Sequence, residues 1–178
     1  MRRTCTGETG AVIPELALML PFLVIMFLGV ADSGFAFRQS QTLVASVRQA
    51  ARTDSSVGSG RQADYQALTS LVASTRELRN VAINKVIVYK TTSTDGAPTN
   101  SACFTKAALA TGTGENGACN IYSPTQLANL TTSSFDATGC AGDWDQYWCP
   151  TTRESRQRAA NGPDYLGIRV VATYTSLT

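Results

Sequence analysis

An apolar run near the N-terminus constrains this chain more than any other feature. From Ala11 to Ala31 the 21 residues include no Lys, Arg, Asn, Gln, Ser or Thr. A helix rises about 1.5 Å per residue, so this run would be about 31 Å long, enough to cross the hydrocarbon core of a bilayer. The pattern therefore predicts a transmembrane helix over residues 11–31, preceded by a polar leader over residues 1–10.

Glu15 is the only ionisable residue in the apolar run. A carboxylate inside a bilayer costs on the order of 3 kcal/mol, and such a residue is by default a functional hypothesis that needs a partner. The alternative is that Glu15 stays at the membrane surface, hydrated among the lipid headgroups. If the leader were removed before Ala11, the chain would begin with the amine of that residue. Residues 11 and 15 are four apart, so this amine and the carboxylate of Glu15 would lie on one face of the first helical turn.

A secretory signal peptide is the competing interpretation of this region. Arg2 and Arg3 would form its basic end, Gly29 and Ala31 would form a small-residue cleavage site, and Asp32 would begin the mature chain. Two features favour a membrane helix instead. The run is longer than the 7–15 residues or so of a typical signal core, and such a core has no place for an acidic residue.

The leader that ends at Gly10, the glutamate five residues later, and the sequences LALMLPFL and QSQTLVASVRQAAR carry a family resemblance. The chain resembles the type IV prepilin class and, within it, the TadE-like minor pseudopilins of tight-adherence (Flp-type) pili. Leu16 departs from the aromatic residue that usually follows the glutamate. The resemblance implies that a prepilin peptidase cuts between Gly10 and Ala11. It also implies that Glu15 pairs with the new amine of a neighbouring subunit.

The resemblance further implies a structural function in assembling a tight-adherence pilus or a related secretion filament. The expected location is the cytoplasmic (inner) membrane, with a single pass, the C-terminal domain outside, and possible incorporation into a surface pilus. The expected partners are the membrane, other pilins and pseudopilins, the assembly platform and the prepilin peptidase. The protein would be oligomeric in a filament or membrane complex. The alternative is a binding or adhesion module, membrane-anchored or secreted with an ordinary signal sequence.

Helical periodicity continues beyond the apolar run, so residues 32–53 are expected to form an amphipathic continuation of the same helix. One face would carry the apolar residues Phe37, Val44, Val47 and Ala51. A second stripe carries the small residues Gly29, Ser33, Ala36 and Ser40. Small residues let helices approach closely, although they also occur in membrane helices without that role. Residues 54–60 are expected to form a hinge.

The remaining chain, residues 61–178, is expected to form a small extracytoplasmic α+β domain. A helix is predicted over residues 61–79, followed by antiparallel strands over residues 81–92 and 165–176 with the helix on one face of the sheet. The insertion between the strands, residues 94–164, is rich in Gly, Thr, Ser, Asn and Asp and is expected to be irregular. One exception is a short helix capped by Ser123.

Four of the five cysteines lie in this insertion. An even number of cysteines in a loop-rich region predicts two disulfides in an oxidising compartment. Short loops favour the pairings Cys103–Cys119 and Cys140–Cys149, although four cysteines allow three connectivities. A zinc site is the rival interpretation, but none of the spacings is a short C-x-x-C.

No enzymatic activity, cofactor or metal is predicted. The chain has no histidine, and no nucleophile and base can be paired by spacing. The net charge of +2 is too small to indicate a nucleic-acid partner. Asp143, Asp145 and Glu154 could bind a cation, but a solvated acidic loop is the expectation. Trp144, Tyr147 and Trp148 could form a binding surface or pack against the adjacent disulfide.

Overall fold

The computed structural model describes residues 12–91, 96–154 and 163–176. The chain divides into two compact units, residues 1–38 with 176–178 and residues 39–175. A single helix, α1 (Val12–Val57), supplies nearly all the described residues of the first unit and continues into the second.

The first unit is an exposed apolar helix. Its large apolar side chains, such as Leu18 (82% exposed) and Phe27 (73% exposed), are largely exposed. Among the described residues, one helix is long and apolar enough to cross a membrane, with a mean hydropathy of 2.1 over its most apolar window. By length and composition, the N-terminal part of α1 therefore has the properties of a single-pass membrane anchor.

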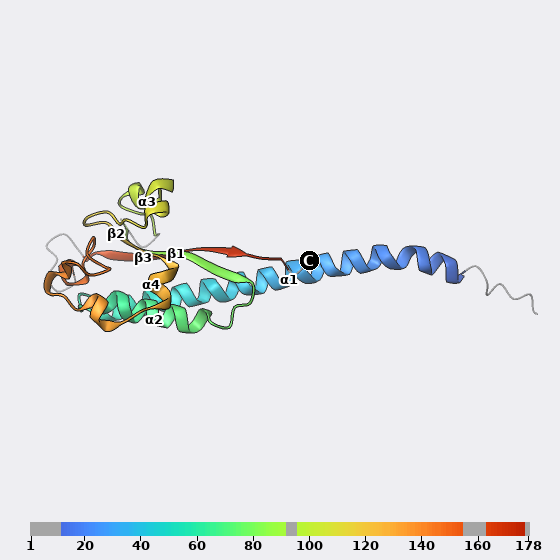
Figure 1. Ribbon diagram of the computed structural model, residues 1–178, viewed down its shortest axis with the longest axis horizontal. Helices are drawn as coiled ribbons and strands as arrows, with labels where there is room; N and C mark the ends of the chain where they lie inside the picture. Colours follow the sequence, from blue (N-terminus) through green and yellow to red (C-terminus); the bar gives the residue numbers. More distant parts are fainter. Residues whose placement is uncertain (1–11, 92–95, 155–162, 177–178) are drawn as a thin grey trace, which may run out of the picture. The chain divides into compact units, whose positions relative to one another are not determined.

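The second unit is built on a three-stranded antiparallel sheet with the order β2-β1-β3. The central strand β1 (Val81–Thr91) pairs with β3 (Tyr165–Tyr174) along its whole length and with β2 (Cys119–Tyr122) over its second half. Helix α2 (Ala63–Thr75) and the C-terminal part of α1 cover one face of the sheet (Figure 1). This arrangement confirms the predicted α+β class and the pairing of the two long strands.

Both faces of the centre of β1 are buried. Val86 and Val88 enter the main core against the helices, whereas Ile87 between them enters a second cluster that surrounds Cys103 and Cys119. Neighbouring side chains of a strand point to opposite faces, so a sheet covered on both sides needs a continuous apolar run rather than an alternating one. The main core contains these buried residues: Ala50, Ala67, Leu68, Leu71, Val86, Val88, Tyr122, Leu127, Phe135 and Trp148.

The insertion is more regular than expected. It contributes β2 as the third strand, and α3 (Lys106–Thr111) lies on the face of the sheet opposite α2 (Figure 1). The prediction of an irregular insertion was therefore wrong in this part. A strand of four residues is too short to show an alternating pattern. The short helix α4 (Pro124–Ala128) was predicted correctly, and Ser123 and Gln126 form a capping box at its start.

Helix α1 ends later, and is rotated differently, than the sequence suggested. Residues 54–57 form its last turn instead of a hinge, and Gly58, at φ +63°, follows the helix and donates its N–H to the Asp54 carbonyl over 2.9 Å. The buried face carries Ser46, Ala50 and Asp54. Phe37 and Val44, two of the four residues predicted for that face, are 67% and 42% exposed. The apolar residues of the sequence do not mark the buried face, because two of the three buried residues on that face, Ser46 and Asp54, are polar.

Candidate functional site

The first turn of α1 contains Glu15, whose side chain is exposed in the isolated chain. A carboxylate at a helix N-terminus interacts favourably with the unpaired N–H groups of the first turn. Gly10 and Ala11, the predicted processing site, lie outside the described residues. The side chain of Glu15 is therefore accessible to a neighbouring molecule. Cleavage of the leader between Gly10 and Ala11 stays a prediction.

The predicted stripe of small residues is also accessible. Gly29, Ser33 and Ser40 are exposed and Ala36 is half-buried. The Ser33 hydroxyl donates to the Gly29 carbonyl over 2.9 Å, so it is satisfied within its own helix. A stripe of this kind presents a shallow surface against which a second helix can pack closely.

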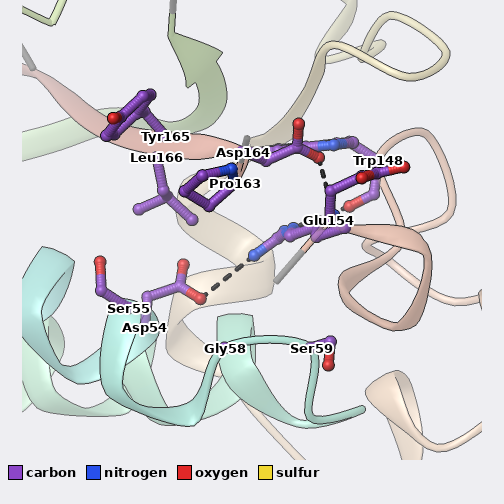
Figure 2. Close-up of a pocket in the computed structure, with 11 residues that line it drawn as sticks. Asp54, Ser55, Gly58, Ser59, Trp148, Glu154, Pro163, Asp164, Tyr165 and Leu166 are labelled. Carbon is purple, nitrogen blue, oxygen red and sulfur yellow. Dashed lines mark hydrogen bonds and ion pairs between the residues drawn. The ribbon is translucent and has the colours of Figure 1, made fainter. Parts of the chain in front are cut away.

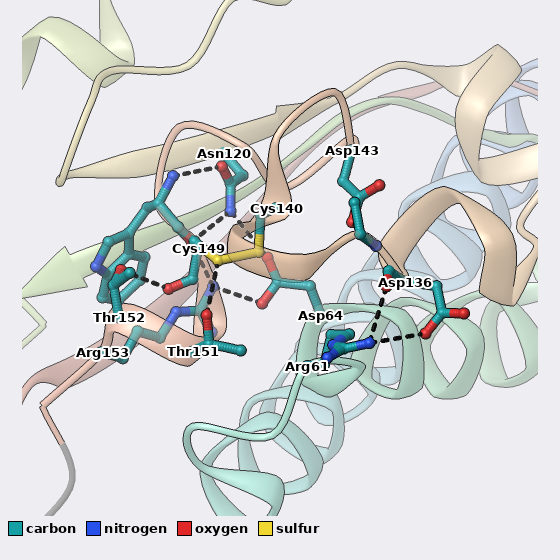
Figure 3. The surroundings of a disulfide bond; sticks show 12 residues. Arg61, Asp64, Asn120, Asp136, Cys140, Asp143, Cys149, Thr151, Thr152 and Arg153 are labelled. Carbon is teal, nitrogen blue, oxygen red and sulfur yellow. Dashed lines mark hydrogen bonds and ion pairs between the residues drawn. A yellow bond between two sulfur atoms is a disulfide. The ribbon is translucent and has the colours of Figure 1, made fainter.

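The second unit contains a buried charge cluster that the sequence did not predict, formed by Asp54, Asp64 and Arg153. Asp54 lies in the last turn of α1, Asp64 in the first turn of α2, and Arg153 in the loop that precedes β3. Arg153 Nη1 lies 3.1 Å from Asp54 Oδ1, and Arg153 Nη2 lies 2.6 Å from Asp64 Oδ1. All three residues are at most 6% exposed. Figure 2 shows the contact with Asp54, and Figure 3 shows Arg153 beside Asp64.

The third strand and the disulfide loop are tied to the same cluster. Asn120 of β2 donates to Asp64 Oδ2 over 3.0 Å and to the Trp148 carbonyl over 2.9 Å, and Trp148 N–H donates back to Asn120 Oδ1. The Tyr122 hydroxyl also donates to Asp64 Oδ2. The Arg153 guanidinium stacks on Trp148, with Cζ 4.2 Å from the ring centroid. Asp64 thus joins α2, β2 and the loop before β3.

The cluster has more carboxyl groups than cations. One guanidinium is shared by Asp54 and Asp64, and Asp54 Oδ2 has no hydrogen-bond partner among the described residues. Burial, reinforced by the charge of Asp64, therefore raises the pKa of Asp54 from 3.8 to about 8. Burial works against the charged form of Arg153, but Asp64 and Asp54 outweigh it and raise the pKa of the guanidinium. Burial and the Asp64 charge likewise raise the pKa of Tyr122.

Both disulfides stabilise the region around this cluster. Cys103–Cys119 joins the segment before α3 to β2, and Cys140–Cys149 closes the loop that carries Trp148 (Figure 3). These are the two pairings that the sequence favoured. The second one fixes the chain four residues before Arg153, so it helps to hold the guanidinium in the core.

The loop closed by Cys140–Cys149 is not the solvated acidic loop that was expected. Asp143 is 6% exposed and Asp145 is fully buried, whereas Glu154 is exposed and lies outside this loop. Burial, with the charges of Asp64 and Asp143, raises the pKa of Asp145 to about 7. The expectation of a solvated loop was wrong because the loop folds with the side chains of Asp143 and Asp145 pointing into the protein interior.

The aromatic residues of this loop belong mainly to the core. Trp148 is 3% exposed, and the half-buried Trp144 packs edge-on against Phe135 with ring centroids 5.7 Å apart. Tyr147 is also half-buried. The three residues do not form the exposed aromatic surface that would favour a binding module.

A cavity of about 520 Å³ borders the charge cluster (Figure 2). Asp54, Arg153, Asp164 and Tyr165 contribute to its lining. Asp164 is paired with Lys90 and also accepts a hydrogen bond from the Glu154 N–H. Ser55 and Ser59 also line the cavity, and the chain has no histidine, the most common general base.

Sequence reasoning could have found part of the charge cluster. Asp64 precedes Leu68 by four residues and Leu71 by seven, so it lies on the apolar face of its helix. An acid on such a face predicts a buried cation nearby. Arg153 carries no comparable signal because it lies in an irregular loop, so its pairing is visible only in the structure.

Comparison with known proteins concerns the N-terminal region. Residues 10–52 match a family model described as TadE-like protein. This segment is similar to the TadE-like family. It begins at Gly10, includes Glu15 and extends along α1 to Arg52, and the match supports a function connected with Tad pili. No curated protein and no solved structure matches the chain.

Proposed function

We propose that this protein is a minor pseudopilin that takes part in assembling a tight-adherence pilus or a related secretion filament. One observation carries the proposal. The TadE-like segment coincides with a helix that is headed by Glu15 and whose apolar side chains are exposed. Helices of this kind need either lipid or other helices around them, and a filament subunit meets both in succession.

In this function α1 is anchored in the cytoplasmic membrane and the second unit lies outside the cytoplasm. Two disulfides support that orientation, because they persist in oxidising compartments and are rare in the cytosol. The partners are other pilins or pseudopilins, the assembly platform and a prepilin peptidase. The role is structural, and no catalytic step is assigned to the protein.

Glu15 fixes the position of one subunit against the next. After cleavage behind Gly10, the ammonium of Ala11 on a neighbouring chain would lie at the same depth in the membrane as Glu15. An opposite charge makes a carboxylate tolerable in lipid, and the pairing favours one axial position of the helices over all others. The exposed stripe of Gly29, Ser33 and Ser40 would allow the helices to pack closely once they are in register.

The proposal is tested by substituting Glu15 in the producing strain. Glu15→Ala should insert into the membrane at least as well as the wild type, because a costly charge is removed. It should nevertheless fail to assemble, since the partner ammonium is left uncompensated. Glu15→Gln should show a milder defect. Membrane fractionation, crosslinking between subunits and filament counts are the readouts.

Leu18→Ala is the matched control, because Leu18 is an exposed residue less than one turn away and carries no charge. It should insert and assemble close to wild-type levels. Normal assembly of Glu15→Ala would show that the carboxylate is only a hydrated residue at the membrane surface. The proposed pairing, and with it the pseudopilin function, would then be rejected.

A further inference from the structure

Among the buried carboxyl groups that the structure describes, Asp145 has both oxygens without a partner. The side chain is 0% exposed, and neither oxygen has a hydrogen-bond partner in another described residue. The carboxyl groups of Asp143 and Asp54 each accept a hydrogen bond from another residue. Asp143 Oδ2 accepts the Ala137 N–H over 2.8 Å, and Asp54 Oδ1 receives Arg153. Burying a carboxylate without full hydrogen bonding or an opposite charge is strongly unfavourable, so a bound cation would stabilise this site.

The surroundings make the deficit larger. The carboxylate oxygens of Asp145 and Asp143 lie within 4.8 Å of each other, and Asp64 adds a third negative charge nearby. The cation of the adjacent cluster, Arg153, is already shared between Asp54 and Asp64. Cys140 lies within the same distance of both carboxylates, but its sulfur is bonded to Cys149 and offers no thiolate.

We propose that Asp143 and Asp145 bind one divalent cation of the calcium class inside the loop closed by Cys140–Cys149. The ligands on offer are carboxylate oxygens, with no histidine anywhere in the chain and no free thiolate at the site. Hard cations such as Ca²⁺ prefer oxygen ligands, whereas zinc prefers nitrogen and sulfur. Backbone carbonyl groups of the loop and water would complete the coordination, as is usual for Ca²⁺.

The ion would stabilise the loop that positions Arg153 and Trp148. It would neutralise the two carboxylates, and it would bind the folded loop but not the unfolded chain, so binding would add to stability. The site is built entirely from the second unit, so it goes beyond the proposed pilus function and does not depend on it.

The test uses the full chain in detergent, treated with EDTA and then dialysed. Addition of CaCl₂ at neutral pH should raise the melting temperature by about 5–10 °C at a 100-fold excess over the dissociation constant. Equilibrium dialysis should show one Ca²⁺ per chain. Tb³⁺, which replaces Ca²⁺, should give luminescence sensitised by Trp144 and Trp148, the only two tryptophans of the chain.

Two variants make the test specific. Asp145→Asn should fold without added metal and lose both the thermal shift and the sensitised luminescence. The matched control is Asp136→Asn, which removes a carboxylate that is 63% exposed and close by in the sequence, and it should respond like the wild type. Absence of Ca²⁺ binding by the wild-type chain would overturn the proposal and assign a proton to Asp145. Equal loss of binding in both variants would also overturn it.

Discussion

Arg153 Nη2 lies 2.6 Å from Asp64 Oδ1, in a buried ion pair between residues 89 positions apart in the sequence. The pair joins the first turn of α2 to the loop that leads into β3. Through its other nitrogen the same guanidinium also reaches Asp54 at the end of α1. One side chain therefore connects α1 and α2 to the loop that leads into the last strand of the sheet.

Removal of Arg153 should be strongly destabilising. Arg153→Ala leaves Asp54 and Asp64 buried beside each other without a cation, and breaking a buried pair in this way typically costs about 3–5 kcal/mol. Urea unfolding of the detergent-solubilised chain, followed by tryptophan fluorescence, measures the loss. Arg61→Ala is the control, because its pair with Asp136 lies at the surface and is worth at most about 1 kcal/mol. Similar losses of unfolding free energy in the two variants would show that the buried cluster contributes no more to stability than the surface ion pair.

Stability should decrease as the pH rises from about 4 to about 8. In this range the folded protein keeps a proton on Asp54, whose pKa is raised to about 8, whereas the unfolded chain has released it. The folded state binds more protons, so each increase in pH favours unfolding until the pH exceeds the folded pKa. Asp64 and Arg153 are the charged groups that set this value along with burial.

Asp54→Asn isolates that contribution. The amide keeps an oxygen that can accept from Arg153 but cannot titrate, so the melting temperature of the variant should vary less with pH than that of the wild type. Asp136→Asn removes an exposed carboxyl group and should keep the wild-type pH profile. An unchanged slope in Asp54→Asn would mean that Asp54 is ionised throughout the range.

The four cysteines of the second unit should be oxidised in the native protein. Alkylation before reduction should label none of Cys103, Cys119, Cys140 and Cys149. Replacing Cys140 and Cys149 together by serine should lower the free energy of unfolding by about 2–5 kcal/mol. It should also make the position of Arg153 less well defined. The corresponding Cys103/Cys119 double variant should lose stability without affecting the pH dependence that arises from Asp54. Labelling of all four thiols in native protein would contradict the disulfides.

The N-terminus of protein recovered from membranes should be Ala11. The expectation rests on Gly10 and on Glu15 five residues later, ahead of the apolar helix. Intact mass spectrometry decides between three outcomes. A retained Met1 would remove the processing step, and a chain beginning at Asp32 would establish the signal-peptide interpretation. Cys5 gives an independent check, since a retained leader adds one thiol that can be alkylated.

The elements with clear periodicity were predictable from the sequence. The strand beginning at Val81 was indicated by its β-branched residues and the strand beginning at Tyr165 by its alternation. The helix containing Leu68 and Leu71 was indicated by its helical spacing. The apolar segment of α1 was equally clear, because a run without polar side chains has few alternatives. The short loops between neighbouring cysteines favoured the disulfide pairings that the structure contains.

The buried polar residues were not predictable in the same way. Asp54 was assigned to a hinge because the residues that follow it are rich in Ser and Gly. Asp145 was assigned to a solvated loop because acidic residues are normally exposed. Their burial depends on partners that lie far away in the sequence, such as Arg153 for Asp54, 99 residues distant. Hydropathy patterns are local and carry no information on such pairs. Part of the rotational error along α1 has the same cause, since Ser46 and Asp54 lie on the face that packs.

The position of Arg153 has a consequence for the order in which the protein matures. Asp54 and Asp64 lie on helices, which can form from local sequence, whereas their cation, Arg153, lies four residues beyond the loop that Cys140–Cys149 closes. In a reducing cytosol this disulfide would not form, and the segment that carries the counter-charge of the two acids would be less constrained. On the proposed route, export would complete the fold. Copies that have not crossed the membrane would then be less able to enter a filament, which is a form of quality control built into the core.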